Sequence, residues 1–250
     1  GAAGVIARQR LDRIVETVSR NGAATVPELA ESFGISESTI RRDLDKLDSA
    51  GRLVKVHGGA VCLEDEHVRR ELTIGERADL RTAEKARISR YAASLIGPDD
   101  LVYIDAGTTC RALVDHIGET RASYVTNSLD SAAALAVRGL SVVVLGGEVK
   151  PATAALVGPE AVETLSRYRF TLGFWGANGV SREYGLTTAE RLEAQVKRLS
   201  IARTGRPFLL ADHTKLGRVG PVVFDPLEAV TVLTDEVPPD WADVATVRAV

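Results

Sequence analysis

The chain has 250 residues, of which 45% are hydrophobic and 26% charged, as in an ordinary soluble globular protein. This length allows one large domain or two of unequal size. With 31 basic and 34 acidic residues the formal net charge is −3. The whole molecule is therefore not a polycation, and any affinity for nucleic acid must come from a local patch.

Patterns typical of several other protein classes are missing. The sequence has no run of about eighteen apolar residues, so we expect no membrane span and a cytoplasmic protein. Cys62 and Cys110 lie far apart, which gives neither a disulfide framework nor zinc-ligand spacing. We expect no metal and no cofactor.

The first helix is predicted from one apolar face with i, i+3, i+4, i+7 spacing. Its members are Leu11, Ile14, Val15 and Val18. Asn21-Gly22 is a typical helix end.

The second helix is predicted to begin at a capping box. The Thr25 hydroxyl can accept a hydrogen bond from the Glu28 amide, and the Glu28 carboxylate can accept one from the Thr25 amide. Pro27 fits the first turn, where no N–H is needed. The expected buried stripe comprises Leu29, Ala30 and Phe33. Gly34 supplies the turn that follows.

Ser36 is the predicted N-cap of a third helix. The expected core residues of this helix are Ile40, Leu44 and Leu47, which leaves Glu37, Ser38, Arg41, Arg42 and Asp45 pointing outwards and Thr39 near the edge. Such helices place their N-terminal residues in the DNA major groove, where Arg can bond guanine and Ser or Thr can bond bases or phosphates. Gly51 closes the helix.

A basic strand over Arg52 to Val56 and a turn at His57-Gly58-Gly59 predict a β-wing. Helix, turn, helix and wing together predict a winged helix-turn-helix that reads DNA. The expected DNA-binding residues are Ser36, Ser38, Thr39, Arg41, Arg42, Arg52, Lys55 and His57.

The charge of this segment leaves an alternative open. Residues 1–60 hold nine basic and eight acidic residues, a net charge of only +1. Arg41 and Arg42 could instead be a solvated pair on an ordinary three-helix bundle, balanced by Asp43 and Asp45.

Four motifs in this segment closely resemble the N-terminal domain of DeoR-family bacterial transcription regulators. They are Arg8-Gln9, Leu29-Ala30-Glu31, the stretch from Thr39 to Leu44, and the stretch from His57 to Ala60. Order and spacing both fit. The resemblance implies a regulator rather than an enzyme.

From about residue 84 onwards, strands and helices alternate, which predicts a parallel α/β sheet. The expected strands lie over 101–105, 124–127, 142–145, 170–175, 208–212 and 230–233, with 142–145 expected to be buried. We divide the chain into a winged helix-turn-helix domain (1–60), a linker (61–80) and an α/β effector domain (81–250).

Hydroxyl-rich and glycine-rich segments follow these strands, at the sheet edge where open α/β sheets bind ligands. Asp105-Ala106-Gly107-Thr108-Thr109 can cradle a phosphate, because glycine admits close approach, two hydroxyls can donate and a helix begins just behind. Thr126-Asn127-Ser128, Gly146-Gly147 and Gly176-Ala177-Asn178-Gly179 extend the pattern. Thr is also a common N-cap, so one such segment alone is weak evidence.

This half is similar to the sensor domain of the same family, which resembles ribose-5-phosphate isomerase in fold and typically senses phosphorylated sugars or sugar-metabolism intermediates. The resemblance adds Glu193, Lys197, Asp212 and Lys215 to the candidate ligand site, although Glu193 and Lys197 are also spaced as a structural helix ion pair. Where the isomerases carry Asp-Gly-Ala-Asp, this chain has Trp175-Gly176-Ala177-Asn178, which lacks the carboxylate base for proton abstraction. We expect no catalytic residue.

The sequence therefore predicts a ligand-responsive regulator, a repressor of a sugar-uptake or sugar-catabolism operon with a phosphorylated sugar as effector. Reading a palindromic operator takes two recognition helices, so we expect a homodimer or homotetramer. The main alternative is a sugar-phosphate isomerase-like enzyme fused to a DNA-binding module. A DNA-binding architectural protein without a ligand fits poorly with the glycine-rich strand ends.

Overall fold

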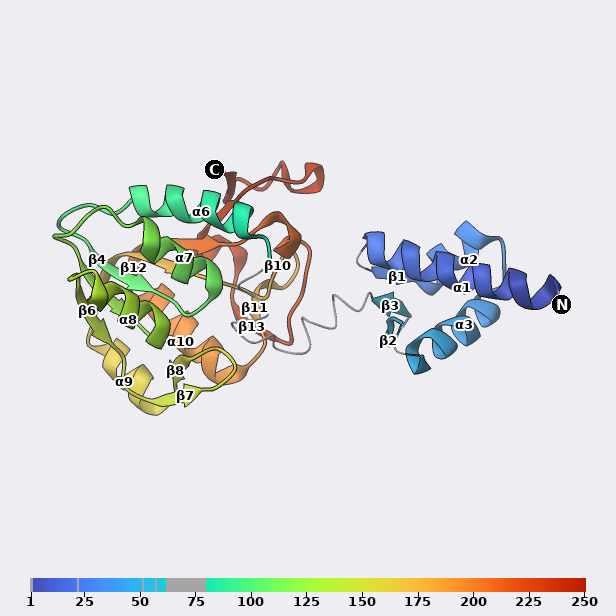
Figure 1. Ribbon diagram of the computed structural model, residues 1–250, viewed down its shortest axis with the longest axis horizontal. Coiled ribbons are helices and arrows are strands. Elements are labelled where there is room, and N and C mark those ends of the chain that lie inside the picture. Colours follow the sequence, from blue (N-terminus) through green and yellow to red (C-terminus); the bar gives the residue numbers. More distant parts are fainter. Residues whose placement is uncertain (1, 22, 51, 57, 62–79) are drawn as a thin grey trace. The chain divides into compact units, whose positions relative to one another are not determined.

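A computed structural model of the chain describes residues 2–21, 23–50, 52–56, 58–61 and 80–250 (Figure 1). The chain divides into two compact units, residues 1–70 and 71–250. This division lies inside the predicted linker 61–80. Because residues 62–79 are outside the described residues, the limits of the linker stay a prediction.

The described part of residues 2–61 folds as three helices and a small antiparallel sheet. Its elements are α1 (Ala2–Asn21), β1 (Ala23–Thr25), α2 (Val26–Phe33), α3 (Glu37–Ser49), β2 (Val54–Val56) and β3 (Gly59–Val61). The strand order is β1-β3-β2, with both pairs antiparallel. This is a winged helix-turn-helix, so the predicted fold of the first sixty residues is confirmed.

The helix signals in the sequence correspond to real contacts in this unit. The Thr25 amide donates to the Glu28 carboxylate at 2.8 Å, and the Glu28 amide donates to the Thr25 hydroxyl at 3.3 Å, which completes the predicted capping box. Gly34 ends α2 in the left-handed conformation, with φ of 64°. Six apolar side chains predicted to face the core are fully buried: Ile14, Val18, Leu29, Ile40, Leu44 and Leu47.

The strand β1 was not predicted, and its pairing with β3 depends on a glycine. Ala24 pairs with Ala60, and Thr25 pairs with Gly59. A Cβ atom at Gly59 would lie 2.3 Å from the Ala24 carbonyl oxygen, well inside van der Waals contact. Only glycine therefore allows the wing to approach β1 so closely.

Residues 80–250 form a larger α/β unit. Its elements are α6 (Thr82–Ser94), β4 (Leu101–Ile104), α7 (Thr108–His116), β5 (Ser123–Thr126), α8 (Leu129–Val137), β6 (Ser141–Val144), β7 (Glu148–Lys150), β8 (Ala155–Val157), α9 (Pro159–Ser166), β9 (Phe170–Trp175), β10 (Gly179–Ser181), β11 (Gly185–Thr188), α10 (Arg191–Ala202), β12 (Thr204–Leu210), η1 (His213–Lys215), β13 (Val222–Asp225), η2 (Leu227–Ala229), β14 (Thr231–Thr234), η3 (Pro239–Trp241) and β15 (Val247–Ala249).

Seven strands of residues 80–250 form the central sheet, in the order β15-β14-β12-β9-β4-β5-β6. Every neighbouring pair is parallel. A smaller antiparallel sheet, β10-β11-β13, and the β7-β8 hairpin accompany it. The predicted parallel α/β fold is confirmed.

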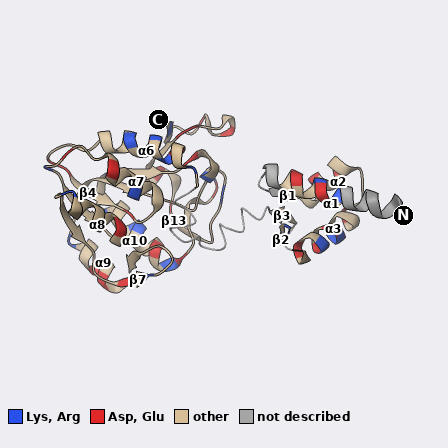
Figure 2. Ribbon diagram, viewed as in Figure 1, with Lys and Arg blue, Asp and Glu red and all other residues tan. Residues whose placement is uncertain are grey.

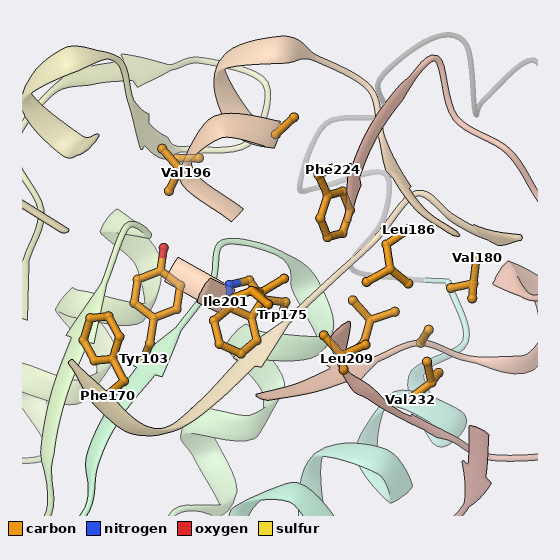
Figure 3. Packing of buried hydrophobic residues seen from close by; sticks show 14 of the residues in the cluster. Tyr103, Phe170, Trp175, Val180, Leu186, Val196, Ile201, Leu209, Phe224 and Val232 are labelled. Atoms are coloured by element: carbon orange, nitrogen blue, oxygen red, sulfur yellow. The ribbon is translucent and has the colours of Figure 1, made fainter. Parts of the chain in front are cut away.

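Helices cover both faces of the central sheet, because side chains alternate along each strand. Val102 and Ile104 of β4 belong to one apolar cluster with residues of α6, α7 and α8. Tyr103, between them, belongs to another cluster with residues of α9 and α10 (Figure 3). The result is a sheet between two helical layers.

The second cluster contains a close contact between a glycine and an indole ring on β9. A Cβ atom at Gly173 would lie 2.2 Å from the Trp175 ring. The ring is fully buried, stacks on Tyr103 with 5.4 Å between ring centroids, and donates from Nε1 to the Ser200 hydroxyl at 2.9 Å. The indole therefore occupies the space that a side chain at position 173 would need.

The prediction of a buried strand over 142–145 is wrong for most of its length. β6 is the edge strand of the central sheet, and Val143 and Val144 are 43% and 42% exposed, whereas Leu145 is buried. A run of valines has the composition of a buried strand but does not show whether another strand lies beyond it.

Candidate functional site

The order of the central strands defines where a ligand site is expected. From β4 the chain continues to β5 and β6 on one side, whereas β9, β12, β14 and β15 follow on the other side. The order therefore reverses between β4 and β9. Ligands of open α/β sheets bind outside the carboxyl ends of the strands at such a switch point.

A buried ion pair lies at this switch point. Asp105 follows β4 and is 1% exposed, and Lys197 reaches it from α10 with a side chain 7% exposed. The Lys197 ammonium donates to the Asp105 carboxylate and also to the Gly176 carbonyl at 3.0 Å. The Gly176 amide donates to the same Asp105 oxygen at 3.2 Å. The pair thus ties together the segments that follow β4 and β9.

Burial and charge act in opposite directions on this pair. Burial raises the pKa of the Asp105 carboxyl above its ordinary value, and the Lys197 ammonium offsets this only in part. Burial would lower the pKa of Lys197, but the charges of Asp105 and Glu193 outweigh it and hold that pKa above its ordinary value. Lys197 is therefore a stable positive charge at the switch point.

The predicted phosphate cradle lies beside the pair. Gly107 has φ of 144° and ψ of 157°, a conformation that is essentially restricted to glycine. It is the N-cap of α7 and provides no side-chain cap, so no cap side chain occupies the first amides of the helix. Thr108 and Thr109, both half-buried, form the first turn. Such amides, with the positive end of the helix dipole, favour an anion.

The polar residues at the end of β5 and just after it hold the neighbouring segments. The Asn127 side-chain oxygen accepts from the Ala106 amide at 2.9 Å, and the Thr126 hydroxyl donates to the Ile104 carbonyl at 2.6 Å. The Ser128 hydroxyl accepts from the Ser131 amide at 3.2 Å and caps α8. Thr126 and Asn127 therefore hold the end of β4 and the segment after it, whereas Ser128 holds the start of α8.

Glu193 is buried in a network that the sequence indicated only in part. The hydroxyls of Thr153 and Thr188 donate to its two carboxylate oxygens at 3.0 and 3.2 Å. Lys150 lies 3.5 Å from one of them. The Thr188 hydroxyl also lies 3.2 Å from the Asn178 side-chain oxygen, which links this network to the segment after β9. Lys150, Thr153 and Thr188 were not predicted, because they lie in β7, in the turn before β8 and in β11, and none of them follows a strand of the central sheet.

The glycines after β6 have a structural reason of their own. Gly147 has φ of 122°, and a Cβ atom there would lie 2.4 Å from the Val157 carbonyl oxygen. It therefore permits the close approach of the β8 backbone. Gly146 and Gly147 follow the edge strand, two strands from β4, or roughly 10 Å across the sheet.

The segment after β12 holds a second polar cluster. The Asp212 carboxylate accepts from the Thr214 amide at 3.1 Å and so caps η1, which ends at Lys215. His213 Nδ1 lies 2.7 Å from the carboxylate of Asp235, a residue that follows β14. Burial alone would raise the pKa of Asp235, but its hydrogen bonds with His213 hold it below the ordinary value. Asp235 was not predicted, although Thr234 at the end of β14 is the same kind of hydroxyl signal as Thr126 at the end of β5.

The predicted recognition helix α3 presents its polar side to solvent. Ser38, Arg41 and Arg42 are exposed, and Thr39 is half-buried. The Ser36 hydroxyl caps the helix by accepting from the Thr39 amide at 3.4 Å, and lies 3.0 Å from the hydroxyls of both Ser38 and Thr39. Ser36 is thus the predicted N-cap.

Three of the predicted DNA-binding cations have acidic partners within the same unit. Arg41 pairs with Glu37 at 2.8 Å, Arg52 pairs with Asp12 at 2.7 Å, and Lys55 pairs with Asp45. Among the residues that the structure describes, Arg42 has no ion pair. His57 lies outside the described residues.

The alternative interpretation held that Asp43 balances the charges of the arginines of α3. In the structure Asp43 has a different partner. Its carboxylate is 3% exposed and accepts from Arg10 Nε at 2.7 Å, which ties α1 to α3. Periodicity could have placed Asp43 on the inner side of the helix, three residues after Ile40. It could not have identified its partner 33 residues away.

A DNA-binding fold joined to an α/β unit with a polar site at its switch point is the architecture of a ligand-responsive transcription regulator. Comparison with known proteins agrees. A model of the DeoR-like helix-turn-helix domain matches residues 10–66, and one of the DeoR C terminal sensor domain matches residues 80–236. The chain belongs to the DeoR family of transcription regulators.

Individual relatives extend over nearly the whole chain. The chain is 34% identical to the uncharacterized HTH-type transcriptional regulator FruR of Bacillus subtilis (strain 168), over 91% of this chain and 90% of that protein. It is 32% identical to the lactose phosphotransferase system repressor of Staphylococcus aureus (strain N315), over 90% of each. Among solved structures, ribose 5-phosphate isomerase A of Methanocaldococcus jannaschii matches 53% of each chain with 14% identity and a TM-score of 0.40.

The family bears on the alternative hypothesis of an isomerase-like enzyme fused to a DNA-binding module. The relatives are transcription regulators, and the chain is accordingly a regulator rather than an enzyme. None of the helices in the described ranges combines the length and apolar character that crossing a membrane requires.

Proposed function

We propose that this regulator is a cytoplasmic repressor of a sugar-uptake or sugar-catabolism operon, and that a phosphorylated sugar is its effector. The observation that carries the proposal is that the buried Lys197 ammonium contacts Asp105 at the switch point, and that the uncapped first turn of α7 begins three residues after Asp105. A lysine ammonium and the uncapped amides of a helix N-terminus both bind phosphate in proteins. The lactose phosphotransferase system repressor of Staphylococcus aureus, at 32% identity, adds support for a sugar-related ligand.

In this proposal the residues of the site have distinct roles. The amides and the side-chain hydroxyls of Thr108 and Thr109, together with the close approach at Gly107, hold the phosphate. Lys197 exchanges part of its contact with Asp105 for the ligand, and Glu193 and Asn178 accept from sugar hydroxyls. The remaining members of the proposed site are Thr126, Asn127, Ser128, Gly146, Gly147, Asp212 and Lys215.

The proposed DNA half acts as a homodimer or homotetramer, because a palindromic operator presents two half-sites. Ser38, Thr39 and Arg42 of α3 lie against the base edges in this proposal, and Ser36, the N-cap of α3, lies beside them in the DNA interface. Arg41, Arg52, Lys55 and His57 contact phosphates. Effector binding changes DNA affinity only if the ligand binds the DNA-competent and DNA-free assemblies with different affinity.

The test is a thermal-shift screen with phosphorylated sugars and their unphosphorylated parents. A ligand at one hundred times its dissociation constant stabilises the native state by about 2.7 kcal/mol, which raises the melting temperature measurably. Both tryptophans of the chain, Trp175 and Trp241, lie in residues 80–250, so their fluorescence reports on the sensor unit. A response to one phosphorylated sugar and not to its parent is the expected result.

Variants locate the site. Thr108→Ala with Thr109→Ala should leave DNA binding intact and abolish the response to the effector. Thr120→Ala, an exposed threonine just after α7, is the matched control and should respond normally. An effector that still acts on the double variant would place the phosphate elsewhere.

A further inference from the structure

The cations expected to contact DNA are already paired with carboxylates of the same unit. Arg41 pairs with Glu37, Arg52 with Asp12 and Lys55 with Asp45. We call Asp12, Glu37 and Asp45 the acidic trio. Their side chains are 47%, 46% and 57% exposed, so all three remain in contact with solvent.

The pairing brings acids and bases from different elements together on one small unit. Figure 2 shows basic and acidic residues close together on α3. Lys55 reaches from β2 to α3, and Arg52 reaches from the start of the wing to α1. This arrangement differs from that of Asp43, whose buried carboxylate holds Arg10 inside the unit. The acidic trio is thus placed on the surface, beside the cations of the recognition helix and wing.

We infer that the acidic trio holds down the affinity of this unit for DNA of arbitrary sequence, so that base contacts decide where the regulator binds. The inference rests on the proposed phosphate contacts of Arg41, Arg52 and Lys55. Non-specific DNA binding comes almost entirely from cations that neutralise phosphates. Each of these cations must leave a carboxylate to contact a phosphate, and the carboxylate then remains near the DNA and repels it.

The acidic trio weakens binding to every DNA sequence alike, whereas base contacts strengthen binding to one particular sequence. Arg42 has no ion pair among the described residues and can bond a guanine without giving up a carboxylate. Specificity is a difference between two affinities and is gained by weakening the wrong complex as well as by strengthening the right one. The low net charge of residues 1–60 is then a property that selectivity requires.

A purely structural role for the trio predicts the opposite result. Asp45–Lys55 and Asp12–Arg52 could serve only to hold the wing, and Glu37 could serve only to stabilise the first turn of α3. Loss of a structural contact disorders the surface and weakens DNA binding. Loss of a counter-charge strengthens it.

The test uses the full chain and a random-sequence duplex of about 30 base pairs as the probe. Glu37→Gln, Asp45→Asn and Asp12→Asn should each tighten binding about twofold to fivefold at low salt, the range expected for an exposed ion pair. The triple variant should bind more tightly than any single variant. Its affinity should also fall more steeply with salt, since freed cations neutralise more phosphate charge.

Glu31→Gln is the matched control. Glu31 is an exposed acid on α2 that has no ion pair among the described residues, so the variant changes the net charge of the unit equally. It should leave the affinity for the duplex nearly unchanged. Equal tightening by this control, or weakening by the trio variants, would overturn the inference.

Two further measurements separate this inference from the proposed DNA contacts. Lys55→Ala should lower the log–log salt slope by about one unit if Lys55 contacts a phosphate. If that slope falls but Asp45→Asn does not tighten binding, the inference fails and the proposed contact stands. If the slope is unchanged, both fail. A duplex selected from a random pool by the wild-type protein should lose its advantage over random DNA in the triple variant.

Discussion

The buried pair of Asp105 and Lys197 can be tested by removing one charge. Lys197→Met keeps the length of the side chain and removes the ammonium, which leaves Asp105 with only the Gly176 amide as a described hydrogen-bond donor to its carboxylate. Asp105 is 1% exposed, so its charge cannot be solvated by water. Breaking a buried pair in this way costs about 3–5 kcal/mol. We expect a loss near the lower limit, about 3 kcal/mol at pH 7.5, because the Gly176 hydrogen bond remains.

The loss should depend on pH in a defined direction. Burial raises the pKa of Asp105, and Lys197 is the main group that opposes this, so the variant raises the pKa further. A carboxyl whose folded-state pKa lies above its unfolded value favours folding at low pH, and this contribution disappears as the pH rises through the folded pKa. The penalty of Lys197→Met should therefore be smaller at pH 5 than at pH 7.5. Asp105→Asn combined with Lys197→Met removes both charges and should show little of this pH dependence.

The measurement is urea unfolding followed by tryptophan fluorescence, which reports on residues 80–250. The free energy of unfolding of the wild type, Lys197→Met and the double variant would be compared at both pH values. A penalty below about 1 kcal/mol, the range of an exposed pair, would show that Asp105 is solvated. A penalty that is the same at pH 5 and pH 7.5 would refute the pKa argument.

Three other substitutions test separate features. Gly107→Ala should lower the free energy of unfolding by about 1–3 kcal/mol, because alanine is strained at φ of 144°, and should weaken effector binding in the thermal-shift assay. Gly59→Ala should abolish DNA binding, because its Cβ meets the Ala24 carbonyl, but leave the fluorescence of the sensor unit unchanged. Arg42→Ala should weaken binding to the selected duplex by about 1–3 kcal/mol and relax specificity at one base pair.

Each of these three has an outcome that counts against it. Normal effector binding by Gly107→Ala would remove the close approach at this glycine from the proposed site. Full DNA binding by Gly59→Ala would mean that the wing tolerates separation from β1. Equal loss of affinity by Arg42→Ala on selected and random duplexes would assign Arg42 to a phosphate.

Local signals in the sequence predicted the elements well. The capping box at Thr25, the N-cap at Ser36 and the apolar face of α3 each depend on residues within one or two turns, and all three were confirmed. The alternation of helices and strands gave the α/β class for the same reason. β1 and the edge position of β6 depend on pairing between distant segments, which composition does not record.

The same contrast between local signals and distant partners applies to the residues of the candidate ligand site. The strand ends that carry Asp105, Gly107 and Asn127 could be found because their motifs are contiguous. The partners that give the site its charge could not. Lys197 lies 92 positions from Asp105, and its four-residue spacing from Glu193 suggested a different pairing. The same limit applies to His213 and Asp235.

The contact between Gly173 and the Trp175 ring constrains how this family member can diverge. No side chain can be added at position 173 while the indole remains, whereas a smaller residue at 175 can be accepted with glycine still in place. The two positions therefore have an obligatory order of replacement, with 175 changing first. The intermediate, with a smaller residue at 175 and glycine at 173, loses a buried indole and about 3–5 kcal/mol of folding free energy. It stays folded only if the free energy of unfolding of the sensor unit exceeds this loss. In evolutionary terms, a side chain at position 173 can arise only in a lineage that has already lost the indole at position 175.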